Sequence, residues 1–217
     1  MATTLDKPAD LPVFPPHNDV AGDCLLARLL EAQPWRRDIA WPAGFEGGIV
    51  HRLDNATSGA ILAADSVEEL LQLRKWFGEH QLVKTYRMLA ARNVNWDRHH
   101  CDAPLAHHPT KKSVMVVQRG RNTPHRGKWY PAHTEFRRLK GQVFEVAMRG
   151  GVMHQIRAHA AFLGIPILGD HRYGGGRREP DAGPTFFLHH ASITGPDGFH
   201  SDPVAMPAWA QAGAGQR

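Results

Sequence analysis

The longest uninterrupted apolar stretch of this chain runs only from Ala60 to Ala64. A membrane-spanning helix needs roughly 20 apolar residues, so we expect no transmembrane segment. Short apolar segments separated by turn residues, including 21 Gly and 16 Pro, instead favour a globular domain of short strands and helices. At 217 residues the chain can bury a large core without disulfides or metal ions. The opening sequence MATTLDKPADLPVFPP lacks the basic start and apolar run of a signal peptide.

Hydrophobic periodicity predicts many strands and few helices. One helix is expected over Cys24–Ala32 and ends before Pro34. A second begins after Ser66, which forms a capping box with Glu69. Its apolar face comprises Val67, Leu70, Leu71 and Phe77, and a third helix covers Met153–Leu163. Strands are expected over Gly59–Ala64, Val83–Ala91, Ser113–Val117 and Phe186–Ile193, and as a hairpin over His133–Leu139 and Val143–Met148.

The order of these elements predicts the fold class. Strands and helices do not alternate strictly, which favours an α/β (α+β) fold with a mixed central sheet and flanking helices. A mostly antiparallel order of that sheet and a central cleft are what the family resemblance described below implies. We divide the chain into an irregular N-terminal segment with one short helix (residues 1–47), a main domain (48–194), catalytic by the resemblance described below, and an irregular C-terminal tail (195–217).

The charge distribution is compatible with a polyanionic partner. The chain has 26 Lys and Arg residues against 21 Asp and Glu residues, a formal net charge of +5. No acidic residue occurs between Asp102 and Glu135, and Trp129 and Tyr130 lie in this stretch. A flexible basic loop beside aromatic residues suits an RNA backbone and unstacked bases, although a solvated loop without a partner has the same composition. Its candidate phosphate ligands are Lys111, Lys112, Arg119, Arg121, Arg126 and Lys128.

Cysteines and histidines do not indicate a metal centre. The two cysteines, Cys24 and Cys101, form no CxxC motif, so we expect neither a disulfide framework nor a structural zinc site, and a reducing cytoplasm is the default compartment. The 15 histidines include several adjacent pairs but no HExxH motif. We therefore expect no metal and no cofactor, and a monomer.

The segment VHRLDNATSGAIL, from Val50 to Leu62, carries the main candidate for chemistry. It consists of a polar turn followed by a buried strand. A carboxylate beside an arginine stays ionised at neutral pH, so Asp54 can serve as nucleophile, base or charge stabiliser. On the local residues alone, an aspartate that only fixes its turn is the more common case.

HRLDNATSGAIL resembles the HRLDxxTSGxxL signature of the RluA-type RNA pseudouridine synthase family. Three further elements follow in the family's order. Lys84-Thr85-Tyr86 is similar to its K-x-Y strand, HQIRAHAAFLGIPILGDHRYGGG (His154–Gly176) to its HQIRxHxxxxGxPIxGDxxYG block, and Leu188-His189 to its late LHA element. The resemblance covers most of the chain.

The chain departs from the family pattern at three positions. Met88 replaces the usual alanine after K-x-Y, Val152 replaces the arginine of the T-G-R that usually precedes HQIR, and His190 replaces the alanine of LHA. Losing the arginine removes a contact to RNA or backbone. The aspartate, the tyrosine and the HQIR arginine are all present.

The resemblance implies isomerisation of a uridine in structured RNA, either tRNA or rRNA, to pseudouridine. The base must leave the stack to be reached. By resemblance Asp54 is the catalytic carboxylate, Tyr86 stacks on the extruded uracil, and Arg157 pairs with Asp54. Arg52 fills the gap left by the base, or binds phosphate, and Ile156 forms an apolar wall. The remaining residues that we assign to substrate binding are His51, Thr57 and Lys84.

Two other classes of function are compatible with parts of the sequence. A non-catalytic RNA-binding protein could retain the fold, but binding alone does not require Asp54, Tyr86 and Arg157 together. A metal-dependent hydrolase using the histidines would contain bound zinc, which elemental analysis detects.

Overall fold

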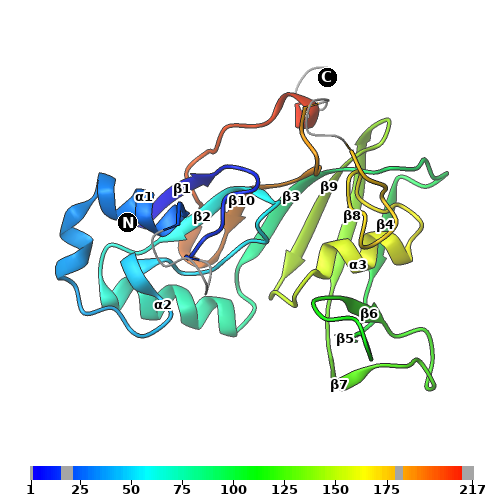
Figure 1. Ribbon diagram of the computed structural model, residues 1–217, viewed down its shortest axis with the longest axis horizontal. Helices are drawn as coiled ribbons and strands as arrows, with labels where there is room; N and C mark the ends of the chain where they lie inside the picture. The colour runs from blue at the N-terminus through cyan, green and yellow to red at the C-terminus, as the bar shows by residue number, and fades with distance from the viewer. Residues whose placement is uncertain (1, 16–21, 179–182, 212–217) are drawn as a thin grey trace. The chain divides into compact units, whose positions relative to one another are not determined.

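The computed structural model describes residues 2–15, 22–178 and 183–211 (Figure 1). The chain forms two compact units, and each is described by itself. The first unit comprises Met1–Lys84 with His190–Met206, and the second comprises Thr85–His189 with Pro207–Arg217. The elements are mostly antiparallel strands with few helices, which confirms the predicted fold class. The predicted central cleft stays a prediction.

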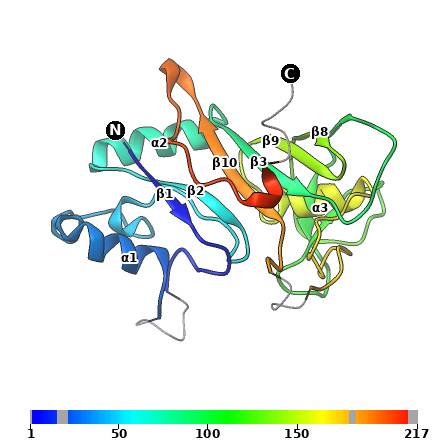
Figure 2. The same ribbon diagram turned by 90° about the horizontal axis from the view of Figure 1, so that it is seen from above.

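The first unit is built on strand β2 (Ser58–Ala63), the buried strand expected after the HRLD turn. An N-terminal strand that the sequence did not indicate, β1 (Thr3–Lys7), pairs with it antiparallel, with Lys7 opposite Gly59. On its other edge β2 is followed by β10 (Leu188–Thr194). Figure 2 shows β1 and β2 between helices α1 (Leu25–Ala32) and α2 (Val67–Gly78).

The capping residues of α2 are those expected from the sequence. Ser66 Oγ accepts a hydrogen bond from the Glu69 backbone N–H at 3.2 Å, while the Glu69 carboxylate accepts from the Asp65 N–H at 2.8 Å. The predicted apolar face of α2 is wrong at one position. Leu71 is 58% exposed, whereas Leu73 is buried with Leu70, because these two residues share the helix face toward the core.

The core of the first unit lies between α2 and β2. It contains Val50, Leu62, Ala64, Leu70, Leu73, Leu82 and Ile193. Val50 begins the loop that carries Asp54, so this apolar cluster anchors that loop at one end.

The second unit contains a four-strand segment in the order β3-β9-β8-β4. The predicted hairpin is present as β8 (Thr134–Lys140) and β9 (Val143–Arg149), which pair antiparallel around the Lys140-Gly141 turn. The flanking strands are β3 (Val83–Leu89) and β4 (Arg98–Cys101). Helix α3 (Gln155–Phe162) contacts β8 and is followed by Gly164, whose φ of +81° favours glycine.

The stretch between Asp102 and Glu135 is not the flexible loop that its composition suggests. It forms a three-stranded antiparallel sheet in the order β6-β5-β7, from β5 (Leu105–His107), β6 (Met115–Val117) and β7 (Arg126–Tyr130). Figure 1 shows this sheet beside α3, which β6 contacts. Leu105, Met115 and Val117 pack with Ala158 of α3, and this apolar core gives the basic segment a fixed structure.

Short 3₁₀ turns complete the described chain, at Pro34–Asp38 (η1), Glu46–Gly48 (η2), Pro196–Gly198 (η4) and Ala208–Ala210 (η5). The last of these contributes buried Ala210 to the second unit, so the predicted C-terminal tail is partly ordered; its residues 212–217 lie outside the described part. No described helix has the length and apolar character needed to cross a membrane.

Candidate active site

Asp54 lies in a tight turn immediately before β2. The Thr57 N–H donates to the Asp54 carbonyl at 3.0 Å, and Thr57 itself is buried. Burial changes from residue to residue along this loop: Arg52 is exposed, Leu53 is buried and Asp54 is half-buried. Gly59 follows at a φ of +110°, where a Cβ atom would lie 2.1 Å from the His190 carbonyl oxygen. Only glycine allows this approach, which holds the end of the loop against β10.

A fully buried lysine supports the Asp54 loop from β1. The Lys7 ammonium donates to the carbonyl oxygens of Pro8, Leu11 and Asn55 at 2.8, 2.7 and 2.8 Å. Burial lowers the pKa of Lys7 to about 8, and the charges of Asp10 and Asp54 oppose this shift. Because Asn55 follows Asp54 directly, Lys7 fixes the backbone beside the candidate carboxylate and places a cation near it. Sequence reasoning missed this residue because a single N-terminal lysine is usually solvated.

We expect Lys7→Met to lower the free energy of unfolding by about 3 kcal/mol, because three carbonyl groups, of which that of Leu11 is buried, lose a charged donor. The measurement is a urea titration of the wild type, Lys7→Met and Lys140→Met, the last removing an exposed lysine of β8. Lys140→Met should unfold as the wild type does. Equal midpoints for all three proteins would show that Lys7 is not a structural anchor.

His51 is held by β2 as a neutral imidazole. Its Nε2 accepts a hydrogen bond from the Leu62 N–H at 3.2 Å, so the ring proton resides on Nδ1. Burial, then the positive charge of Lys84, lowers the pKa of His51 to about 3, and Arg74 adds a smaller effect in the same direction. The ring also lies 5.1 Å from that of Phe77. These contacts make His51 an anchor of the loop.

Arg157 in the second unit binds a buried aspartate. Its Nε and Nη2 donate to the Asp170 carboxylate at 2.7 and 2.9 Å, and the Asp170 side chain is fully buried. The guanidinium carbon lies 5.2 Å from the Tyr173 ring centroid and 5.3 Å from that of Phe186. A forked pair of this kind fixes the guanidinium plane. The pairing of Arg157 with Asp54, which lies in the other unit, stays a prediction.

Sequence reasoning did not identify Asp170 as a partner of Arg157. The signal was available, because Asp170 and Tyr173 lie in the same motif block as Arg157. The Tyr173 hydroxyl accepts from the Met115 N–H at 2.8 Å and lies 3.0 Å from His154 Nδ1, so it can donate to that nitrogen. Two residues of the HQIR run are therefore positioned by the end of the block.

Tyr86 and Ile156 are both buried, at 6% and 5% exposure. Tyr86 lies with Lys84 and Met88 on the buried face of β3, because every second residue of a strand faces the same side. Ile156 precedes Arg157 in the first turn of α3. The structure thus presents the predicted stacking and wall residues as parts of regular elements.

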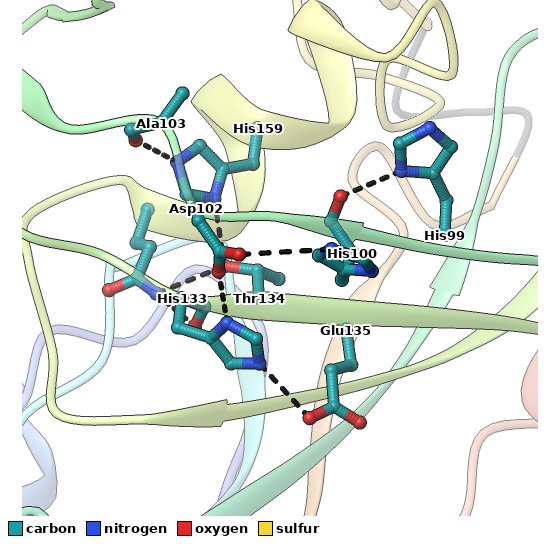
Figure 3. A network of polar contacts seen from close by, with 9 residues as sticks. His99, His100, Asp102, Ala103, His133, Thr134, Glu135 and His159 are labelled. Carbon is teal, nitrogen blue, oxygen red and sulfur yellow. Dashed lines mark hydrogen bonds and ion pairs between the residues drawn. The ribbon is translucent and has the colours of Figure 1, made fainter.

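The other polar residues of α3 anchor the helix to β8 (Figure 3). Gln155 donates from Nε2 to the His133 carbonyl at 2.8 Å and to Thr134 Oγ1 at 3.0 Å. His159 Nε2 lies 2.9 Å from the Ala103 carbonyl, which can only accept, so Nδ1 accepts from the Thr134 hydroxyl at 2.9 Å. Burial lowers the pKa of His159, in agreement with this neutral form. Both nitrogens of His159 are therefore engaged in the helix anchor.

A second cluster of polar side chains lies on the sheet of the second unit. His133 binds the carboxylates of Glu135, at 3.0 Å, and Asp102, and these two hydrogen bonds raise its pKa (Figure 3). The residues line a pocket of ≈610 Å³ in which Arg137 is bonded to Glu145. The charged side chains that line this pocket are thus largely hydrogen-bonded to one another. Among the residues that the structure describes, no three His, Cys, Asp or Glu side chains are grouped to hold a metal ion.

The basic segment presents its cations outward. All six candidate phosphate ligands are exposed, in the β5–β6 loop, in the β6–β7 loop and on β7. The Trp129 ring packs against that of His125 in a tilted arrangement, with 4.3 Å between ring centroids, and the Lys128 ammonium lies 5.2 Å from the Tyr130 centroid. The small sheet is therefore a structured basic surface with aromatic side chains on it.

Comparison with known proteins identifies relatives of this chain. The family model described as RNA pseudouridylate synthase matches residues 3–162. Ribosomal large subunit pseudouridine synthase D of Salmonella typhimurium is 34% identical over 194 residues, which cover 85% of this chain and 53% of that protein. RNA pseudouridine synthase 2, chloroplastic, of Oryza sativa subsp. japonica is 36% identical over 136 residues, 59% of this chain and 29% of that protein. The chain thus spans about half, or less, of the length of these relatives.

A solved structure has the same fold. Human RNA Pseudouridylate Synthase Domain Containing 4 matches with a TM-score of 0.66 at 21% identity, over 96% of this chain and 87% of that one. At this identity the likeness concerns the fold alone.

Proposed function

Because the chain belongs to the RNA pseudouridylate synthase family, we propose that it isomerises a uridine in RNA to pseudouridine, with Asp54 as the catalytic carboxylate. The observation that carries this proposal is the position of Asp54 in the matched HRLDNATSGAIL block. Asp54 is half-buried in a turn, and the Lys7 ammonium donates a hydrogen bond to the carbonyl oxygen of the next residue, Asn55. A carboxylate so placed lies near a cation and is held in one backbone conformation, which suits a group that must approach a sugar carbon.

The proposed reaction needs neither cofactor nor metal. The bond between C1′ and N1 breaks, the uracil turns, and C5 bonds to C1′; C5 then loses its proton and N1 gains one, so the product is an isomer of the substrate. Asp54 attacks the sugar or removes a proton from it, in the manner of carboxylates in glycosidic chemistry. We assign stacking on the uracil to Tyr86, an apolar wall to Ile156 and orientation of the carboxylate to Arg157.

The remaining substrate contacts complete this proposal. Arg52, exposed two residues before Asp54, occupies the gap left by the flipped base. His51 and Thr57 shape the loop and Lys84 contacts the substrate. The names of the relatives favour ribosomal RNA over tRNA as the substrate class. We propose that the protein acts as a monomer in the cytoplasm, although one relative is named as chloroplastic.

Chemical mapping of pseudouridines in total RNA, with and without the purified protein, tests the function directly. The expected result is one or a few new pseudouridines in ribosomal RNA. RNA binding without any new pseudouridine would favour the alternative, a non-catalytic RNA-binding protein that retains the fold.

The basic surface is proposed to bind the RNA backbone. Neutralising Arg119, Arg121, Arg126 and Lys128 together should weaken RNA binding and spare the single-turnover rate at saturation, because phosphate contacts position the substrate but make no bonds. If all four bind phosphate, the slope of log affinity against log salt should fall by about three. The measurement is RNA affinity across a salt series, with Lys140→Gln as a control at an exposed site outside the surface. An unchanged slope would identify a solvated surface without an RNA contact.

A further inference from the structure

Lys84 is a buried cation to which the described residues offer no carboxylate as a counter-charge. It is 7% exposed on β3, and its ammonium lies 5.5 Å from the Phe77 ring centroid. Lys7, the other buried lysine, is bonded to three carbonyls. For Lys84, in contrast, no carboxylate or carbonyl among the described residues accepts a hydrogen bond from the ammonium. A charged group with so little contact to water and no carboxylate beside it is uncommon in a folded protein, because burial removes most of the hydration of the charge.

The surroundings of Lys84 increase this cost. Burial lowers its pKa to about 8, and its charge in turn lowers the pKa of His51. The other charged group near His51 is Arg74, also a cation. A methionine of similar length would fill the same space without the charge, so stability alone does not explain a lysine at this position. A buried cation that is not paired within the protein is suited to a negative charge that the substrate brings.

The strand places Lys84 beside the residue that we assign to the base. Lys84 and Tyr86 are two positions apart on the same face of β3, so their Cα atoms are about 7 Å from each other. Under the proposed function Tyr86 covers the face of the uracil ring. A lysine one step along the same strand face then reaches the edge of that ring, where the carbonyl oxygens lie.

We propose that the Lys84 ammonium stabilises the negative charge that develops on the uracil as the glycosidic bond breaks. When the C1′–N1 bond breaks, its electron pair passes to N1 and is shared with the O2 and O4 oxygens. Lys84 makes and breaks no bond in this step; it supplies a fixed positive charge that is worth most when the uracil is anionic. This inference rests on the proposed function and assigns Lys84 as a catalytic residue within it.

The test is the single-turnover rate of pseudouridine formation at saturating RNA for the wild type, Lys84→Met and Lys84→Arg. Lys84→Met should lower the rate by about 10²–10³-fold, the loss typical of removing one electrostatic stabiliser, with RNA affinity unchanged. Its urea midpoint should equal or exceed that of the wild type, because a buried charge has been removed. Lys75→Met, at an exposed lysine of α2, is the matched control and should behave as the wild type.

The pH profile separates this role from a structural one. The wild-type rate should fall as the pH rises through about 8, the pKa of Lys84. Lys84→Arg should retain part of the rate and lose that alkaline decrease, because a guanidinium does not titrate in this range. His51 is neutral throughout, and any decrease that remains in Lys84→Arg is assigned to Lys7, whose pKa is also about 8.

Two results would overturn the proposal. An unchanged rate in Lys84→Met, combined with a salt slope of affinity smaller by roughly 0.7–0.9, would make Lys84 a phosphate ligand. Wild-type rate, slope and pH profile in both variants would make it a space-filling residue. If the wild type itself forms no pseudouridine, the proposed function fails; if it does and the variants match it, only the role of Lys84 fails. Should Lys84→Met not fold, the pH profile of Lys84→Arg decides.

Discussion

Asp54→Asn should abolish pseudouridine formation and leave RNA affinity within about twofold of the wild type. Asparagine keeps the volume and the turn but removes the charge and the nucleophilic or basic oxygen, so the loss falls on the chemical step. Where a comparable substitution removes an essential carboxylate from an active site, kcat falls by about 10⁴-fold. The fold should survive, because the turn depends on the Asp54 carbonyl accepting from the Thr57 N–H and on Lys7 binding the Asn55 carbonyl.

Asp10→Asn is the matched control. It removes the same charge from an exposed position that also acts on Lys7, but outside the HRLD motif. Asp10 has a φ of +62°, a conformation that asparagine adopts readily, so the exchange is not strained. Single-turnover assays should show full activity for Asp10→Asn and none for Asp54→Asn. Turnover by Asp54→Asn near the wild-type rate would require another group to carry the reaction.

Local sequence rules predicted the elements that local interactions determine. The capping box at Ser66, the glycine after α3 and the β8–β9 hairpin each depend on residues a few positions apart, and all three are present. The missed elements depend on distant partners. β1 is short and follows no clear alternation, and it becomes a strand because β2 offers a free edge to it.

The basic segment shows the same limit. The charges and turn residues of this segment predict a loop. However, Leu105, Met115 and Val117 pack with Ala158 of α3, which lies far along the chain. The strand expected over Ser113–Val117 is present as β6, whereas β5 and β7 carry too few apolar residues for a periodicity signal, although enough to form a small sheet against a helix. Composition therefore predicted the charge of this surface correctly and its order wrongly.

In the candidate site, too, the sequence predicted some residues and not others. The motif blocks identified Asp54, Tyr86 and Arg157 because their residue types and spacing are a signature, whereas the residues that hold them are known only from the structure. Lys7 is recognisable as an anchor only from the hydrogen bond that its ammonium donates to the Asn55 carbonyl, and Asp170 only from the binding of its carboxylate to Arg157. No local pattern relates Lys7 to Asn55, whereas Asp170 shares the motif block of Arg157 and its place in that block was the available signal.

Arg157→Met should both destabilise the protein and impair catalysis. Its removal leaves the Asp170 carboxylate, which is fully buried, without its forked partner. Breaking a buried pair from one side costs about 3–5 kcal/mol, so the urea midpoint should fall clearly. Catalysis should fall as well, because under the proposed function this guanidinium orients the catalytic carboxylate. Arg157→Lys keeps a charge but cannot form two parallel bonds, so it should recover only part of either property.

The double variant Arg157→Met with Asp170→Asn separates the two effects. Without a buried charge to leave unpaired, it should regain at least half of the lost stability, since replacing both members of a buried pair is far less costly than removing one. The single-turnover rate should remain low in the double variant, because neither substitution restores a cation to the reaction. If the double variant recovers activity together with stability, Arg157 serves only to bind Asp170. The cation that orients Asp54 must then come from another element. Lys7 is the first candidate, because its charge and that of Asp54 interact.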